Sequence, residues 1–183
     1  MMDSGEIARM QNLTIRPATL DDLPRLTEIQ NHYIKNTHVT FDVQTFDPEQ
    51  RRTWFHEHSD GRRYQLLVAD DREKGVLGYA CTGRFRAKEA YETTVEASIG
   101  CRPDATGQGL AKLLYGALFE ALAQQDIHRI VAGVAQPNPA SNALHERFGF
   151  KMIGAFSEVG RKFDKYWDVL WWERPLKLNA SRS

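Results

Sequence analysis

The chain has 183 residues, of which 42% are hydrophobic and 26% charged, and its 24 basic residues balance 24 acidic ones. This length suits one domain with its own core, and the zero net charge disfavours a nucleic-acid binder, which usually carries a basic excess. No apolar run approaches the ~20 residues of a membrane span, and the start of the chain lacks a signal peptide's apolar stretch. We therefore expect a cytoplasmic protein with no membrane partner, in which Cys81 and Cys101 are buried free thiols.

The first half of the chain alternates between strand-like and helix-like segments. A single domain is predicted at 13–177, between tails at 1–12 and 178–183. Thr19 is suited to cap the first helix, and Lys74-Gly75 makes the last two strands of this half an antiparallel hairpin. The predicted elements are a strand, two helices and two strands, at 13–16, 19–35, 47–58, 64–70 and 76–82.

The second half begins with a connection of mixed aromatic and basic residues at 83–92. A strand, a helix, a strand, a helix and two final strands are then predicted at 93–101, 110–122, 129–135, 138–148, 150–156 and 166–172. A loop at 157–165 is expected to join the last two strands. The order β-α-α-β-β-β-α-β-α-β-β predicts an α/β fold in which helices cover both sides of a mixed sheet.

Small residues mark the start of the long helix at 110–122. Gly107, Gly109 and Ala111 lie where a strand gives way to apolar residues at helical spacing. Free backbone N–H groups and the positive end of the helix dipole meet there, which favours phosphate oxygens. Alternatively, the glycines only relieve crowding of the helix against the sheet. The P-loop and Rossmann patterns are both absent, so neither nucleotide hydrolysis nor dinucleotide binding is indicated.

Three further sets of residues are candidates for chemistry. Asn138, Ser141 and His145 fall on one stripe of the helix at 138–148, which is either a site or a solvated face with a surface histidine. Glu96 stands alone among β-forming residues, where a carboxylate is costly unless it faces water or a partner. In the connection, Arg86 belongs to a basic and aromatic cluster that could equally be an ordinary solvated loop.

Residues 106–111 resemble the acyl-CoA pyrophosphate loop of the GNAT N-acetyltransferases, in which a Gln or Arg lies three positions before Gly-x-Gly/Ala. Gly109 and Ala111 match, whereas Thr106 replaces the Gln or Arg. The element order resembles the GNAT fold over 13–175. His145 in LHERFGF is similar to the phosphinothricin and methionine sulfoximine acetyltransferase group. Four further stretches resemble the same group, NTHVTFD at 36–42, GRFRAKEAY at 83–91, TVEASI at 94–99 and VGRKFDKYWDV at 159–169.

The resemblance implies direct transfer of an acetyl group from acetyl-CoA to the amino group of a small amino-acid analogue, without a metal. Glu96 would be the general base that takes a proton from the ammonium, and His145 would be the acid or hold a water near the departing thiolate. The cofactor would contact Ile99, Gly100, Cys101, Gly107, Gln108, Gly109, Leu110, Ala111, Lys112, Asn138 and Ser141. The amine would contact Phe41, Phe85, Arg86, Lys88 and Tyr91.

Other interpretations stay open at this point. Gly100 departs from the aromatic residue common there in the group, and not all members share Lys88, so another amine or a protein N-terminus is an alternative substrate. A non-catalytic acyl-CoA-binding regulatory domain and a ping-pong mechanism with Cys101 as nucleophile are further alternatives. The aromatic strand at 166–172 predicts a homodimer in which a second copy covers part of it, as in the resembled group.

Overall fold

The computed structural model describes residues 12–58 and 61–176, and its elements follow the predicted order. The strands are β1 (Leu13–Pro17), β2 (Leu66–Asp71), β3 (Gly75–Arg84), β4 (Thr94–Cys101), β5 (Arg129–Ala135), β6 (Lys151–Lys162) and β7 (Lys165–Pro175). The helices are α2 (Leu23–Asn36), α3 (Arg52–His56), α4 (Leu110–Leu122) and α5 (Pro139–Arg147). Apart from Asn12, the predicted tails lie outside the described residues. None of the helices within the described ranges is long and apolar enough to cross a membrane.

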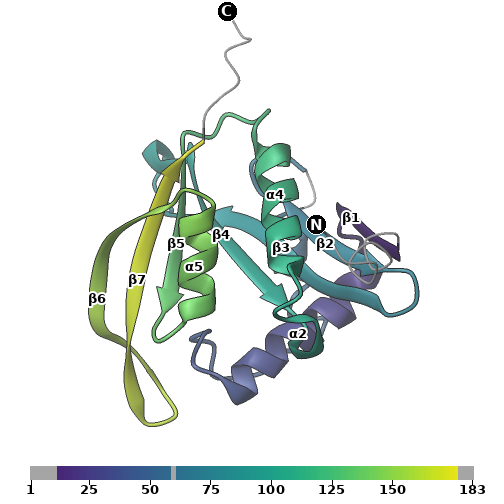
Figure 1. Cartoon of the computed structure of the whole chain (residues 1–183), viewed down its shortest axis with the longest axis horizontal. Coiled ribbons are helices and arrows are strands. Elements are labelled where there is room, and N and C mark those ends of the chain that lie inside the picture. Colours follow the sequence, from purple (N-terminus) through teal and green to yellow (C-terminus); the bar gives the residue numbers. More distant parts are fainter. Residues whose placement is uncertain (1–11, 59–60, 177–183) are drawn as a thin grey trace, which may run out of the picture.

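The described strands form one sheet in the order β1-β2-β3-β4-β5-β7-β6. Every neighbouring pair is antiparallel except β4 and β5, which run parallel. The parallel pair is short, because only Thr94–Glu96 have partners on β5, at Arg129–Val131. The remainder of β4 therefore separates from β5 in the middle of the sheet (Figure 1).

Two apolar cores lie on opposite faces of the sheet. On one face, the stripe of α4 that includes Leu114, Leu118 and Leu122 packs on alternate residues of the central strands, and α5 lies beside it. On the other face, α2 and α3 pack through Leu26, Ile29 and Phe55. Because successive strand residues point to opposite faces, one strand serves both cores: on β2, Leu67 and Ala69 face α4 whereas Leu66 and Val68 face α2.

Two predicted boundaries were wrong. The second helix was expected at 47–58, but α3 spans only Arg52–His56. Asp47 and Gln50 exchange side-chain and backbone hydrogen bonds of 2.9 Å, and this local closure favours turns over the preceding residues.

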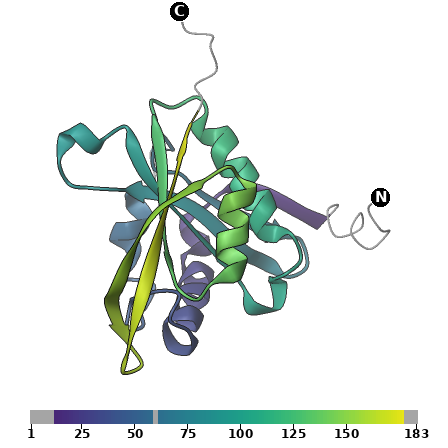
Figure 2. The ribbon, with the colours of Figure 1, turned by 60° about the vertical axis from the view of Figure 1, so that its left-hand side comes forward.

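The expected loop at 157–165 is also wrong, because β6 and β7 continue as a hairpin to Phe163 and Asp164. Pairs such as Gly160 with Trp167 extend the ladder, and an irregularity between Phe156 and Gly160 bends it. β7 lies inside the sheet and Trp172 on it is buried, so the exposed edge is β6 rather than the aromatic strand at 166–172 (Figure 2).

Candidate active site

A cavity of about 820 Å³ opens where β4 and β5 separate. Six segments contribute to it: α2, the loop after α2, the end of β4, the loop before α4, the first turn of α4, and α5 with the residue before it. All the predicted cofactor residues except Gln108 lie along this cavity. Its lining is Gln30, Tyr33, Val39, Thr40, Ile99, Gly100, Cys101, Ala105, Thr106, Gly107, Gly109, Leu110, Ala111, Lys112, Asn138, Ala140, Ser141, Ala143, Leu144 and Arg147.

The loop before α4 needs its glycines for their backbone conformation. Gly107 and Gly109 have φ of 72° and 79°, and Gly109 caps the helix in the left-handed region. A Cβ added at either position would meet nothing within 4 Å, which excludes crowding against the sheet as their cause. The loop therefore presents bare backbone at the N-terminus of α4, a 13-residue helix whose dipole favours anions.

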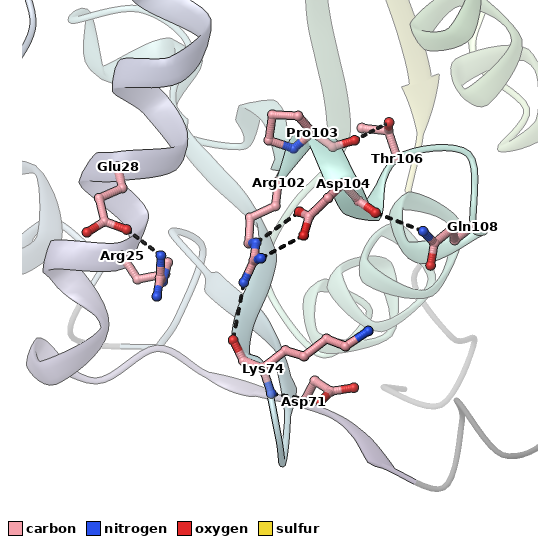
Figure 3. A network of polar contacts seen from close by, with 9 residues as sticks. All are labelled: Arg25, Glu28, Asp71, Lys74, Arg102, Pro103, Asp104, Thr106 and Gln108. Carbon is pink, nitrogen blue, oxygen red and sulfur yellow. Dashed lines mark hydrogen bonds and ion pairs between the residues drawn. The ribbon is translucent and has the colours of Figure 1, made fainter.

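Side-chain contacts brace the loop before α4 (Figure 3). Arg102 donates two hydrogen bonds to the carboxylate of Asp104, at 3.0 and 2.7 Å, and the amide of Gln108 donates to the Asp104 carbonyl at 2.8 Å. Gln108 is thereby turned away from the cavity. The hydroxyl of Thr106 donates to the Pro103 carbonyl at 2.8 Å, so this side chain closes the loop on itself.

The end of β4 offers backbone N–H groups to the cavity. The N–H of Arg102 donates to the Leu77 carbonyl on β3 at 2.8 Å. Since alternate N–H groups of a strand point to opposite edges, those of Cys101 and Ile99 point away from β3 toward the separated side. The hydroxyl of Tyr33 donates to the Cys101 carbonyl at 2.6 Å and fixes this end of the strand.

Gly100 makes room for an aromatic ring from the neighbouring strand. A Cβ at Gly100 would lie 2.8 Å from Cε1 of Tyr79. The hydroxyl of Tyr79 in turn donates to the Gln30 side chain at 3.0 Å. Tyr79 from β3 thus occupies the space that a side chain at position 100 would need.

Glu96 lies on the strand face of β4 that carries Gly100, opposite the face on which Val95 and Ala97 pack under α4. It does not line the cavity, since four residues of strand separate it from Gly100 by about 13 Å. Exposed Ser98 lies between them. Partial burial raises the pKa of the Glu96 carboxyl, and the positive charge of Arg86 opposes that rise.

His145 is buried rather than solvated. Its Nδ1 donates to the Ser141 carbonyl at 2.7 Å, so the ring is a neutral tautomer whose Nε2 accepts the hydroxyl of Tyr115 at 3.2 Å. Desolvation lowers the pKa of this imidazole. The polar stripe on α5 therefore divides: Asn138 and Ser141 lie along the cavity, whereas His145 points into the core between Phe150 and Trp172.

Residues 12–151 match the model of the acetyltransferase (GNAT) domain, which covers most of the chain. This protein belongs to the GNAT acetyltransferase family. The GNAT identification agrees with the resemblance seen in the loop before α4 and in the element order. The protein is an N-acetyltransferase, and acetyl-CoA is its co-substrate.

Two curated proteins and one solved structure are similar to this GNAT enzyme over most of its length. A phosphinothricin N-acetyltransferase of Streptomyces coelicolor is 51% identical, covering 88% of this chain and 95% of its own. An L-methionine sulfoximine/L-methionine sulfone acetyltransferase of Pseudomonas paraeruginosa is 36% identical, covering 93% and 97%. A GNAT phosphinothricin acetyltransferase from Sinorhizobium meliloti, solved in complex with acetyl-CoA, is 28% identical with a TM-score of 0.86, covering 94% of this chain and 92% of its own.

The basic and aromatic cluster of the GNAT enzyme gathers near Glu96. The ring of Phe85 meets Tyr91 and Trp171 edge-on, with centroids 5.7 and 6.0 Å apart, and the Arg86 guanidinium lies 4.9 Å above Phe85. Lys88 precedes a short 3-10 turn that brings Tyr91 back toward Phe85. Phe41 lies against β6, where a Cβ at Gly160 would meet its ring.

Sequence reasoning missed several residues that line the cavity or the cluster. Tyr33 lies at apolar helical spacing, which does not separate a core position from one at the rim of a cavity. Arg147 follows Ala143 by one helical turn, a spacing that would have revealed it. Trp171 is far from Phe85 in the sequence, and their rings meet only because β7 pairs with β5 in the sheet. Among residues 12–58 and 61–176, no cluster of His, Cys, Asp or Glu could hold a metal ion.

Proposed function

We propose that this enzyme acetylates the amino group of a small amino-acid analogue of the phosphinothricin or methionine sulfoximine type. The observation that carries the proposal is a carboxyl of raised pKa, Glu96, on the strand face that leads to Gly100 in the cavity. The names of the two relatives support the same substrate class. Arg86 and Lys88 supply the positive charge that the carboxylate and second acidic group of such a substrate require.

In the proposed mechanism each part of the cavity has one task. Backbone N–H groups at Gly107–Ala111 bind the diphosphate of acetyl-CoA, and Asn138 and Ser141 contact its pantetheine arm. The N–H groups of Ile99 and Cys101 polarise the thioester carbonyl. Lys112 and Arg147 add positive charge at the rim.

Glu96 accepts a proton from the substrate ammonium, directly or through a water above Ser98, because the protonated amine cannot attack. The neutral amine then attacks the thioester carbon and the C–S bond breaks. The departing coenzyme A thiolate takes the second proton of the amine nitrogen, which leaves the amide and the free thiol. His145 holds α5 through Tyr115 and Ser141 and acts as a positioning residue. The apolar walls of the amine site are Phe41, Phe85 and Tyr91.

The raised pKa of the Cys101 thiol supports direct transfer of the acetyl group and disfavours a mechanism with an acyl-enzyme intermediate. Burial raises the pKa of this thiol to about 11, which leaves almost none of it as the reactive thiolate at neutral pH. The Nε2 of His145 is engaged with Tyr115 and is not available to activate it.

A homodimer is part of the proposal, and β6 supports it. This 12-residue edge strand exposes Met152, Ile153, Phe156 and Val159, a run of apolar side chains that a second copy would cover. We also propose a cytoplasmic location, in keeping with two free, buried cysteines.

The test is thiol release from acetyl-CoA with phosphinothricin, methionine sulfoximine, methionine sulfone, a polyamine and a peptide with a free N-terminus. The proposal expects turnover with the first three. A polyamine or the peptide as the best substrate would favour the alternative amine. Binding of acetyl-CoA by calorimetry without any turnover would favour a non-catalytic domain. Mass spectrometry of the enzyme after acetyl-CoA alone should detect no acetylated Cys101.

A further inference from the structure

The loop at 38–42, which follows α2, is held by the tip of the β6–β7 hairpin. Val39 and Thr40 of this loop line the acetyl-CoA cavity, and Phe41 is the proposed wall for the amine. The hairpin tip is far along the chain from this loop, yet the two lie side by side (Figures 1 and 2).

The ring of Phe41 packs on Gly160. A Cβ built on Gly160 would overlap Cε2, Cζ and Cδ2 of Phe41, closer than two carbon atoms can approach. Gly160 is buried and does not need a positive φ. Glycine is therefore required here because the ring of Phe41 rests on the backbone, and a larger residue would push that ring away.

Neighbouring residues of the hairpin fix the rest of the loop. Lys162 lies two residues further along the same face of β6 and is 4% exposed. Its ammonium donates a hydrogen bond to the Thr40 carbonyl at 2.8 Å. Trp167, opposite Gly160 on β7, stacks on His38 with ring centroids 4.0 Å apart. The indole N–H of Trp167 donates to the Lys162 carbonyl at 2.9 Å, which ties these two anchors together.

We propose that Gly160 is a positioning residue for amine binding, through Phe41, and that the β6–β7 tip thereby helps set which amines are accepted. The inference rests on the proposed function in one respect, that Phe41 bounds the amine. Lys162 and Trp167 hold the loop backbone, and Gly160 fixes where the aromatic side chain stands on it.

Gly160→Ala tests the proposal, and Gly154→Ala is its matched control, because Gly154 lies on the same strand and a Cβ there would meet nothing within 4 Å. The Gly160→Ala variant should raise KM for the amine by roughly tenfold while kcat changes less than about threefold, as expected when a binding contact is displaced. The control should match the parent enzyme. Equal KM values for the two variants would overturn the proposal.

A double-variant cycle separates positioning from a general structural effect. In a Phe41→Ala background the added methyl group has room, so Gly160→Ala should leave KM unchanged and should not lower Tm. An equal rise in KM with and without Phe41 would overturn the proposal, because Gly160 would then act by another route.

A second measurement does not depend on turnover. Hydrogen exchange of the amides at 38–42 should be faster in Gly160→Ala than in Gly154→Ala or the parent protein. If the parent enzyme acetylates no amine of the panel, the proposed function fails while this measurement still tests the contact. Unchanged exchange in Gly160→Ala would overturn the inference even for a fully active enzyme.

Discussion

The phenol of Tyr115 donates a hydrogen bond to Nε2 of His145 over 3.2 Å, and both side chains are buried between α4 and α5. His145→Phe keeps an aromatic ring but leaves this hydroxyl without its acceptor, so the free energy of unfolding should fall by about 1–3 kcal/mol. Turnover should fall less than in a variant of the general base. Urea unfolding and steady-state rates at pH 7.5 measure the two effects, and a loss of all turnover without loss of stability would contradict a positioning role.

The same histidine makes stability depend on pH. Burial lowers the pKa of His145 below its ordinary value of 6.5, so the unfolded chain binds more protons than the folded one as pH falls through that value. Stability should therefore decrease below about pH 6.5, and His145→Phe should weaken this decrease. Burial also lowers the pKa of His58, so part of this decrease should remain in the His145→Phe variant. Urea unfolding between pH 7.5 and 5.5 provides the check, and an unaltered slope in the variant would exclude His145 as a source.

Glu96→Gln should reduce kcat by on the order of 10²–10⁴-fold, since an amide of the same shape cannot accept the proton. Acetyl-CoA should still bind, because Glu96 lies outside the cavity lining. Calorimetry and thiol release check these two statements, with Glu89→Gln, an exposed carboxylate of the neighbouring turn, as control. Undiminished turnover would remove Glu96 from the mechanism.

Arg86 should affect both amine affinity and the protonation of Glu96. Its positive charge opposes the rise in the pKa of Glu96, so Arg86→Gln should raise that pKa further. The acidic limb of the profile of kcat/KM against pH should then move to higher pH, while KM for the amine increases. Lys88→Gln should increase KM without moving the limb. A limb that stays in place in Arg86→Gln would show that Glu96 is not the titrating base.

Gly109→Ala isolates the role of backbone conformation in the loop before α4. With φ at 79°, alanine there should cost roughly 1–2 kcal/mol of stability, and acetyl-CoA affinity should fall as the loop adjusts. Gly116→Ala, inside α4 with no atom within 4 Å of the added Cβ, should instead be stabilising by about 0.5–1 kcal/mol. Thermal unfolding and calorimetry compare the two variants. Equal effects on acetyl-CoA binding would contradict the assignment of the loop.

The exposed edge of β6 predicts the state of association. The parent protein should sediment as a dimer at micromolar concentration, and Ile153→Glu should shift it to monomer by placing a charge among apolar side chains. Leu20→Glu changes an exposed apolar residue in the turn before α2 and should leave the dimer intact. A parent protein that sediments as a monomer would refute the homodimer.

The sequence by itself determined the elements whose signals are local. The apolar spacing of α4 and the continuous apolar run of β5 predicted 110–122 and 129–135, and both match the observed bounds. The glycines before α4 were also readable, because a left-handed residue at a helix start is a property of a few adjacent residues. The motifs around these elements were enough to indicate the family.

Only the tertiary structure decided which residues meet. Asn138, Ser141 and His145 share one stripe in sequence, but Tyr115 on α4, Phe150 just before β6 and Trp172 on β7 enclose His145, and the other two lie at the cavity. The cavity exists because β4 and β5 pair over three positions and then separate, and Phe41 stands where Gly160 allows it. Such contacts join residues far apart in the chain, and their energies depend on sheet pairing and burial, which no local pattern of residues encodes.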